Sequence, residues 1–497
     1  MFEYLLAGFA NVFEPWNFLL MVFGTVVGVI ISCLPGLSGS MGIILLLPLT
    51  YTLPKSTALV MLCGIFCGSM FGGSVSAILL RTPGTPSATA TLLDGYPLAQ
   101  QGKAGKAIGV AAVGSFIGGI ISTICLIFIA PQLAKVALKF HSADYFALAL
   151  FGISIMASAA GKNVLKGLVA GAVGLLISMV GTDPLVGAAR FNFGSAKMMI
   201  GFPQLAVLIG VFAISEVFTQ VQGGNHRVEV KDQAVTNIMP TFKEIRGFLV
   251  AAIVGALIGV FIGIVPGTGG AIAVFIAYNV AQKISRHPEQ FGHGSYEGIA
   301  APEASNNGTT GGALIPMLCL GIPGDTVTSV MLGALTLIGV TPGPQLFTQS
   351  ADIVYAIFAG MIVIQFVMLF FGVIFARVAP KVLKVPVRYL MPIILVLCVV
   401  GAFCLANQTY HVAVAIAFGF IGYFMKKFGF PGAPMVLGVI LGPIAEKNLD
   451  RALQLSRNDW TIFFRRPIAL TFILLSVGMI AWTVIGNFRD AKKANKA

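Results

Sequence analysis

Two Pro-Gly pairs interrupt long uncharged stretches of the chain. Pro35-Gly36 lies midway through residues 15–54, and Pro266-Gly267 lies midway through residues 247–282. Proline removes a backbone donor and clashes with the preceding helical turn, so we expect a helix to break at each pair. The freed N–H groups could bind an anion at a helix N-terminus, and the freed carbonyl oxygens could bind a small cation.

Short polar side chains surround these breaks and a second pair of Pro-Gly sequences. Their hydroxyl, amide and carboxylate oxygens suit a small cation, so one cavity could hold an organic anion beside a coupling ion. The predicted substrate-binding residues are Pro35, Gly36, Ser38, Gly39, Arg81, Thr82, Pro83, Gly84, Thr85, Pro266, Gly267, Thr268, Gly269, Asn306, Asn307, Thr309, Pro323, Gly324 and Asp325. The predicted sodium-binding residues are Ser38, Ser74, Thr268, Asn306, Thr310, Asp325 and Thr326. For any single Ser or Thr the alternative is close packing of membrane helices.

Charged residues beside the second pair of breaks carry the most specific chemistry. Arg81 could pair with a substrate carboxylate through its guanidinium fork, or it could be a helix-end arginine. Asp325 could coordinate a cation or relay a proton, and it could equally cap a helix. Structural roles are favoured for Asp94 and Glu303. A charge inside a bilayer costs at least about 2.5 kcal/mol, so each of these four charged residues is expected to have a structural or functional role.

The breaks belong to an internal repeat. Residues 28–39 align without gaps on residues 259–270, which lie 231 positions later. Residues 72–87 align with residues 311–327 in the same order, allowing small insertions. Paired breaks at corresponding positions of two halves point to the binding site of a transporter.

The elements that must position these residues are membrane helices. Of the 497 residues, 57% are hydrophobic and only 10% are charged, whereas about 25% are charged in soluble chains. The uncharged stretches allow about 11–14 membrane segments of ~20 residues. We predict an all-α polytopic membrane protein with two pseudo-symmetric repeats, expected to be inverted, whose helices are broken at Pro-Gly or form re-entrant hairpins. The net charge of +13 is spread over short loops and indicates topology rather than nucleic-acid binding.

The repeat predicts the domain organisation. We expect a first transmembrane repeat at residues 1–221, a polar linker at residues 222–246 and a second repeat at residues 247–497 with a basic C-terminal tail. The number of crossings between matched elements, and therefore the orientation of the termini, is left open.

These motifs together resemble the large membrane subunit of the tripartite tricarboxylate transporters, the TctA family. The most specific segments are 34–39, 82–88, 93–98, 297–307 and 321–325. The resemblance implies a bacterial inner-membrane secondary transporter, not an enzyme and without a cofactor. It implies citrate or related di- and tricarboxylates as substrates, a periplasmic binding protein and a small membrane subunit as partners, and sodium as the coupling ion, with protons as the alternative. Arg81 departs from the family pattern, in which a small polar residue such as Asn often stands at this position, and this implies a different or more highly charged substrate.

Two other interpretations fit parts of the pattern. A passive anion channel would also line its pore with Ser, Thr and Gly. An intramembrane serine protease could use Ser38 with His411 as the base, but the repeated copy of this motif, Thr268-Gly269-Gly270, has no serine. No phosphate-binding loop for ATP is present. We therefore predict ion-coupled uptake by alternating access, of the elevator type.

Overall fold

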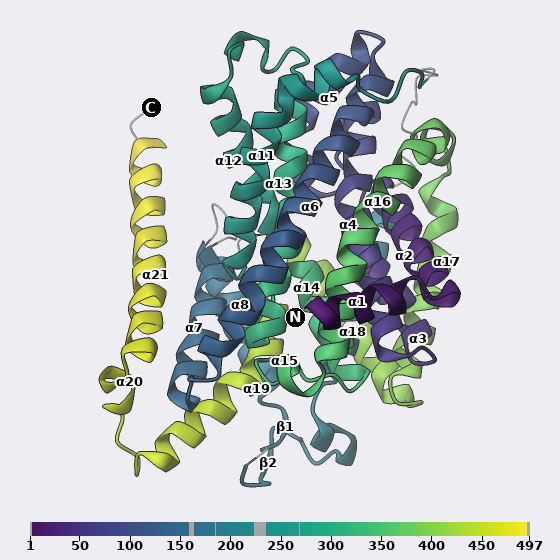
Figure 1. Cartoon of the computed structure of the whole chain (residues 1–497). Coiled ribbons are helices and arrows are strands. Elements are labelled where there is room, and N and C mark those ends of the chain that lie inside the picture. Colours follow the sequence, from purple (N-terminus) through teal and green to yellow (C-terminus); the bar gives the residue numbers. More distant parts are fainter. Residues whose placement is uncertain (1, 159–163, 184, 223–234, 268, 495–497) are drawn as a thin grey trace. The chain divides into compact units, whose positions relative to one another are not determined.

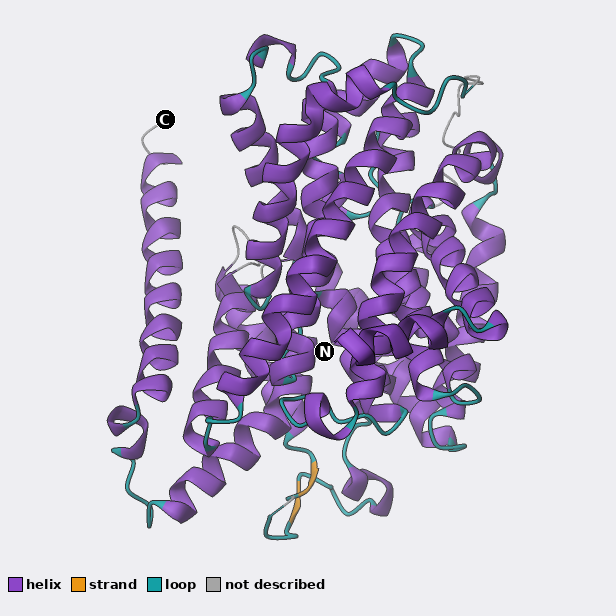
Figure 2. Cartoon of the chain, in the orientation of Figure 1, coloured by secondary structure: helices purple, strands orange, loops and turns teal. Residues whose placement is uncertain are grey.

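The computed structural model describes residues 2–158, 164–183, 185–222, 235–267 and 269–494, and these are almost entirely helical (Figures 1 and 2). The chain forms two compact units. Unit 1 contains Met1–Ala134 and Thr219–Leu397, and unit 2 contains Lys135–Phe218 and Cys398–Ala497. Each unit therefore takes chain from both predicted repeats.

Unit 1 holds all of the Pro-Gly breaks. From the first half it contains α1 (Phe2–Val12), α2 (Pro15–Cys33), α3 (Gly39–Thr50), α4 (Lys55–Leu80), η1 (Pro86–Ala88), α5 (Leu92–Gln100) and most of α6 (Ala104–Ala137). From the second half it contains α11 (Phe242–Ile264), α12 (Gly269–Ile284), η5 (Pro288–Gln290), α13 (Tyr296–Leu320), α14 (Thr326–Leu337), α15 (Leu346–Gln349), α16 (Ala351–Val382) and the first part of α17 (Val387–Cys404).

Unit 2 contains helices and a small antiparallel hairpin in which Gly181 pairs with Arg190. Its elements are α7 (Ser142–Ser158), α8 (Val164–Ser178), β1 (Gly181–Thr182), β2 (Ala189–Arg190), η3 (Ala196–Ile200), α9 (Gln204–Leu208), the π-helical turn η4 (Ile209–Ile214), the first half of α10 (Ser215–Gln222), α18 (Thr409–Lys427), α19 (Gly432–Leu455), α20 (Ile462–Arg465) and α21 (Pro467–Ala494), together with the last residues of α6 and α17.

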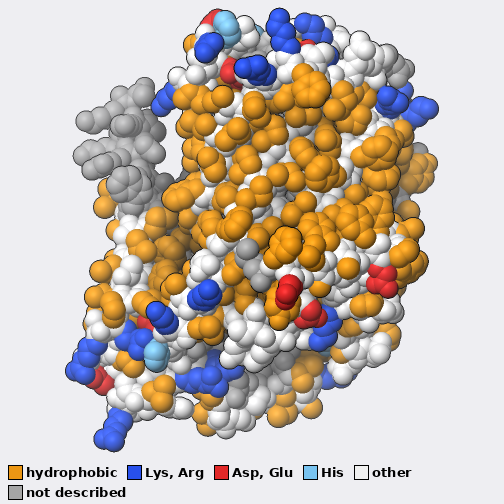
Figure 3. Space-filling model, in the orientation of Figure 1, with side chains coloured by type: hydrophobic (Ala, Val, Ile, Leu, Met, Phe, Trp, Pro, Cys, Tyr) orange, Lys and Arg blue, Asp and Glu red, His pale blue; other side chains and the backbone are white. Residues whose placement is uncertain are grey.

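The prediction of an all-α polytopic membrane protein is confirmed. Among the described residues, seven helices are long and apolar enough to cross a membrane, and six more apolar helices are shorter. Large side chains on α6 and α16, such as Phe128, Phe366 and Phe370, are exposed, as lipid contact requires. Figure 3 shows a broad hydrophobic surface, with Lys and Arg side chains gathered at the end of unit 1 where α5 lies.

Both predicted helix breaks are present. The chain leaves α2 after Cys33 and begins α3 at Gly39, and it leaves α11 after Ile264 and begins α12 at Gly269. At the breaks, Gly36 and Gly267 have φ values of 86° and 79°, which L side chains rarely adopt. A helix of 12 residues such as α3 spans only about 18 Å, well short of the ~30 Å hydrocarbon core. It therefore forms one half of a broken span.

The predicted linker is partly helical at its end. Residues 223–234 of it lie outside the described residues, and α11 begins at Phe242, inside the predicted range 222–246. Thr241 and Glu244 form a capping box in which each side chain accepts from the backbone of the other. The charged side chains in the first turns of α11 make this helix start look like part of a polar linker in the sequence.

Helix α2 packs along α4, and α11 packs along α13, through glycines at equivalent positions of the two halves. A Cβ atom on Gly28 would lie 2.4 Å from the carbonyl oxygen of Ile65, and one on Gly259 would lie 2.1 Å from that of Ser305. Only glycine allows two helix backbones to approach this closely. Because the same contact recurs at both repeat positions, the structure supports the predicted pseudo-symmetry.

Candidate substrate and ion site

Within each half, the second Pro-Gly break packs directly against the first. A Cβ atom on Gly84 would lie 1.9 Å from the carbonyl oxygen of Ser32 at the end of α2. In the second half, a Cβ atom on Gly324 would lie 2.8 Å from the carbonyl oxygen of Gly263 at the end of α11, and the N–H of Gly267 donates to Gly324 O at 2.8 Å. Residues distant in sequence therefore meet at each pair of breaks.

The breaks of the two halves also contact each other. The contacts are crossed: the first break of each half lies against the second break of the other half. Gly39 begins α3, and its Cβ position lies 3.6 Å from the side chain of Val327 in α14. Gly270 lies near the start of α12, and its Cβ position lies 3.1 Å from the Cβ of Ser87 in η1. Gly39 is equivalent to Gly270 in the repeat, and Ser87 is equivalent to Val327, so both contacts join equivalent pairs. The four breaks therefore gather in one region of unit 1.

Three helices that each form one half of a broken span begin in this region, namely α3, α12 and α14. Ser38 caps α3 by accepting from the N–H of Met41 at 3.5 Å. Asp325 caps α14 by accepting from the N–H of Thr328 at 2.7 Å. Thr268, which precedes α12, lies outside the described residues. Helix starts present unpaired N–H groups and the positive end of the helix dipole, so this region favours an anion.

Polar groups border the helix starts symmetrically. The Oγ of Ser69 lies 2.2 Å from the Cβ position of Gly39, and the Oγ1 of Thr309 lies 3.4 Å from that of Gly270. Asn306 Oδ1 lies 3.1 Å from the same position on Gly270. This oxygen is buried and has no hydrogen-bond partner among the residues that the structure describes, although Asn306 Nδ2 donates to Met70 O at 2.9 Å. An unpaired buried acceptor beside a helix start is suited to bind a cation or a substrate hydroxyl.

The other predicted site residues lie in differing surroundings. Thr82 is exposed and donates to Leu80 O at 3.4 Å, and Thr85 Oγ1 lies 3.2 Å from Ser87 Oγ. Ser74, predicted as a sodium ligand, donates to Glu303 instead, and Thr310 donates to Asn307 O at 2.7 Å. Pro35, Pro83, Pro266 and Pro323 lie at the breaks themselves, and Thr326 is half-buried at the start of α14. The substrate and sodium roles of all these residues stay predictions.

Arg81 occupies a left-handed position that sequence reasoning missed. It ends α4 with a φ of 58°, and its repeat equivalent Gly321 ends α13 with a φ of 69°. The side chain is exposed and its guanidinium carbon lies 5.7 Å from the ring centroid of Tyr96. A left-handed conformation costs an L residue about 1–2 kcal/mol, and Asn or Gly tolerates it better. The backbone therefore explains why Asn suits this position.

An Arg81→Gly variant is expected to unfold at a higher temperature than the wild type. Removing the left-handed strain should gain about 1 kcal/mol, less a few tenths for the lost contact with Tyr96. Thermal unfolding of the purified protein measures this change. The uptake rate of the same variant tests the predicted carboxylate contact, because a helix-end arginine can be replaced without loss of transport. A lower unfolding temperature would show that the Tyr96 contact outweighs the strain.

Asp94 has a structural environment. Its Oδ1 accepts from the backbone N–H groups of Gly292, Gly294 and Ser295 at 2.8–2.9 Å. Its Oδ2 accepts from the hydroxyl of Tyr278 at 2.8 Å. Asp94 on α5 therefore fixes the loop between α12 and α13, which comes from the other half of the repeat.

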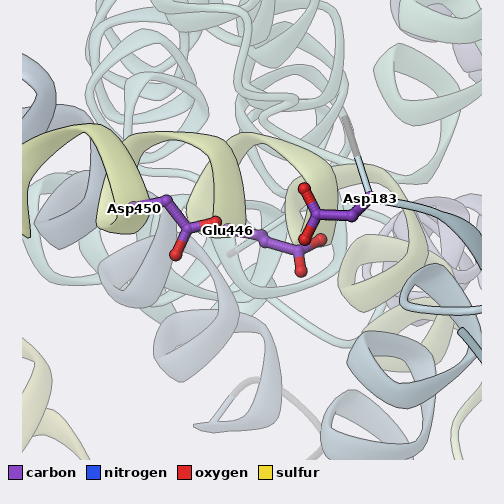
Figure 4. Close-up of side chains that lie close together, drawn as sticks. All are labelled: Asp183, Glu446 and Asp450. Atoms are coloured by element: carbon purple, nitrogen blue, oxygen red, sulfur yellow. The ribbon is translucent and has the colours of Figure 1, made fainter. Parts of the chain in front are cut away.

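Unit 2 contains a separate cluster of carboxylates, Asp183, Glu446 and Asp450 (Figure 4). Their oxygens lie within 4.8 Å of one another, and all three residues are half-buried. Arg190 forms ion pairs with Glu446 and, at 3.4 Å, with Asp183. The backbone N–H groups of Val186 and Leu185 donate to Asp183 and lower the pKa of its carboxyl group. The ion pair between Arg190 in the hairpin and Glu446 in α19 therefore stabilises the packing of the hairpin against α19.

The comparisons with known proteins agree with the resemblance seen in the motifs. A family model described as "Tripartite tricarboxylate transporter TctA family" matches residues 18–437. The chain belongs to the TctA family. This TctA chain is therefore a component of a tricarboxylate transporter, and the family is one of transporters rather than enzymes.

Two relatives of this TctA chain come from Agrobacterium vitis. The "Uncharacterized 52.8 kDa protein in TAR-I ttuC' 3'region" is 35% identical over 485 residues, which cover 98% of this chain and 96% of the relative. The "Uncharacterized protein in TAR-II ttuC' 3'region" is 36% identical over 227 residues, which cover 46% of this chain and 94% of the relative. No solved structure matches this TctA chain significantly.

Proposed function

We propose that this TctA chain imports an organic di- or tricarboxylate across the bacterial inner membrane, driven by a sodium gradient. The observation that carries the proposal is the crossed meeting of the half-helices, where Gly39 approaches Val327 and Gly270 approaches Ser87. Each half thereby supplies helix starts to one shared region.

The chemistry of this region suits an anion with an accompanying cation. The start of α3, capped by the neutral Ser38, offers the positive end of a helix dipole to a substrate carboxylate, whereas the start of α14 already carries the carboxylate of Asp325, which could bind the cation. Asn306 Oδ1 is a free hard oxygen at the same place, and a bound cation there would offset the repulsion between several substrate charges. Ion coupling follows if substrate and cation stabilise each other when both are bound.

An elevator-type movement suits the packing. In the α2–α4 and α11–α13 pairs a Cβ atom on Gly28 or Gly259 would lie under 3 Å from the backbone of the partner helix, so the helices pack closely and each pair is expected to move as a rigid body. We propose that unit 1 contains the moving hairpins that carry substrate. A periplasmic binding protein would deliver the carboxylate, and a small membrane subunit would complete the transporter.

Uptake of a panel of labelled carboxylates into proteoliposomes tests the proposal. Both partner subunits are included, and the sodium gradient is present or absent at constant pH. We expect accumulation of at least one carboxylate only with the gradient. Accumulation that follows a pH gradient alone would replace sodium by protons, and flux that only dissipates a substrate gradient would instead support the passive channel.

An Asp325→Ser variant separates the charge of this residue from its capping role. Serine is a good N-cap, so α14 should keep its start and the free energy of unfolding should change by less than about 0.5 kcal/mol. If the carboxylate takes part in ion coupling, uptake should fall at least about tenfold. Asp325→Ala is the matched variant that removes both the cap and the charge. Uptake at the wild-type rate in Asp325→Ser would show that the residue only caps the helix.

A further inference from the structure

Three buried polar side chains lie along one face of α13. Glu303, Asn307 and Thr310 are spaced by four and three residues, so they share a helix face, and all three are 0% exposed. Helix α6 runs along this face. Ser115 Oγ donates to Glu303 Oε2 at 2.9 Å, and Ser122 Oγ donates to the carbonyl oxygen of Asn307 at 3.3 Å.

Glu303 has hydroxyl donors but no cationic side chain. Its Oε1 accepts from Ser74 and Thr91, and its Oε2 accepts from Ser115 alone, which leaves that oxygen able to bind a further group. In the part of the chain that the structure describes, Glu303 forms no ion pair. An ionised carboxylate buried in a membrane helix needs a compensating positive charge.

Two buried amides, Asn307 on α13 and Gln365 on α16, have side-chain atoms without a hydrogen-bond partner among the described residues. These atoms are Asn307 Oδ1 and Nδ2 and Gln365 Oε1, and Gln365 is also 0% exposed. Gln365 Oε1 lies 1.9 Å from the Cβ position of Gly119, which stands between Ser115 and Ser122 on the same face of α6. The Gln365 oxygen therefore reaches the level of Asn307.

The orientation of the Gln365 amide is fixed from its other end. Its Nε2 donates to Cys67 Sγ at 3.4 Å, so its oxygen is directed away from α4. An unpaired buried amide costs about 1–3 kcal/mol. Two such amides on the helices around Glu303, whose carboxylate has hydroxyl donors but no ion pair among the described residues, supply oxygen ligands of the kind that hard cations bind.

We propose that Glu303, Asn307 and Gln365 form a binding site for Na⁺ that is separate from the helix starts. The ligands are Glu303 Oε2, Asn307 Oδ1 and Gln365 Oε1, with water completing the coordination. The bound ion neutralises Glu303. The proposal deepens the proposed function, on which it rests for the role of the ion, because this site would hold the coupling cation that the Pro-Gly region was predicted to hold.

An Asn307→Leu variant tests the site by Na⁺-dependent stability. The purified full chain is unfolded by heat in NaCl or in choline chloride at equal ionic strength. Ligand that binds only the folded state raises the unfolding midpoint, so we expect NaCl to raise it for the wild type. Asn307→Leu, and Gln365→Leu as a second variant on a different helix, should need at least tenfold more Na⁺ for the same increase.

Asn17→Leu is the matched control. Asn17 is a buried asparagine of unit 1 with every side-chain group satisfied, since it donates to Asn11 O and Glu14 and accepts from Thr57. This variant should be less stable without Na⁺ yet keep the wild-type response to Na⁺. Asn307→Leu should be at least as stable as the wild type without Na⁺, because it removes unpaired polar atoms.

Three results would overturn the site. These are the absence of a Na⁺-specific increase in the wild type, an unchanged response in both leucine variants, and a midpoint that follows pH in place of Na⁺, which would indicate a protonated Glu303. Carboxylate uptake, measured separately from the stability response to Na⁺, distinguishes failure of the transport proposal from failure of the site. Carboxylate uptake without any Na⁺ response leaves transport intact and removes the site, whereas a Na⁺ response lost in Asn307→Leu without any uptake leaves the site intact and removes transport.

Discussion

A Gly84→Ala variant is expected to be destabilised by about 3 kcal/mol or more and to lose uptake. The new Cβ would lie 1.9 Å from the carbonyl oxygen of Ser32 and 2.9 Å from the Cα of Gly73. Both are backbone atoms, so no side-chain rotation relieves the clash, and the two breaks of the first half would be forced apart. The unfolding midpoint of the purified protein and its uptake rate in proteoliposomes measure the two losses.

Gly247→Ala is the matched control for this substitution. Gly247 lies in the first turns of α11, and its Cβ position has no atom within 4 Å. Alanine is the better helix former by about 0.8–1.0 kcal/mol, so this variant should be as stable as the wild type or more stable. If both variants unfold at the same temperature, the breaks can separate without loss, and the close packing described for them is not required.

An Asp94→Ala variant is expected to lose at least about 4 kcal/mol of stability, even if water replaces part of the four lost hydrogen bonds. The substitution leaves the N–H groups of Gly292, Gly294 and Ser295 and the hydroxyl of Tyr278 without their shared acceptor, and hydrogen bonds to a charged group contribute about 1.5–3 kcal/mol each. The loop before α13 should then open locally. Faster hydrogen exchange at those three amides, together with a lower unfolding midpoint, measures the effect.

Two variants control for the loss of a carboxylate alone. Asp94→Asn keeps an oxygen acceptor for the loop and should lose less than half as much stability. Glu289→Ala removes a carboxylate whose ion pair with His287 is exposed, and it should change stability by less than about 0.5 kcal/mol. Exchange rates that stay at the wild-type level in Asp94→Ala would show that the loop is held by other contacts.

The helix breaks could be predicted from sequence because their cause is local. Proline and glycine at positions 35–36 and 266–267 disrupt a helix whatever surrounds them, and the structure ends α2 and α11 just before them. The repeat could be recognised in the sequence because the same proline and glycine residues recur at equivalent positions of the two halves. Helix α11 begins at Phe242, inside the predicted linker of residues 222–246, because charged side chains that cap and follow a helix start resemble a polar linker in sequence.

The arrangement of the site could be predicted only in outline. Clustering of the breaks was inferred from their paired positions, but the crossed contacts of Gly39 with Val327 and of Gly270 with Ser87 depend on packing between the halves. Arg81 was interpreted by its charge, whereas its backbone conformation is set by the end of α4. Its equivalence to Gly321 was the available signal.

The buried acids show why partners across the chain are hard to infer. The hydrogen-bond donors to Asp94 and Glu303 come from distant parts of the chain, such as Gly292 for Asp94 and Ser74 and Ser115 for Glu303. No short motif encodes such a pairing. Sequence reasoning favoured structural roles for both residues, and the geometry supports that role for Asp94.

The crossed contacts have an evolutionary consequence. In a symmetric homodimer, a residue that touches a second residue of the other subunit is matched by the reverse contact, which is the mark of an isologous interface. Gly39 with Val327 and Gly270 with Ser87 follow this rule across the two halves of one chain. The reciprocal contacts are those that a half-length subunit would make with a second copy of itself, as expected if the chain arose by duplication and fusion of such a subunit.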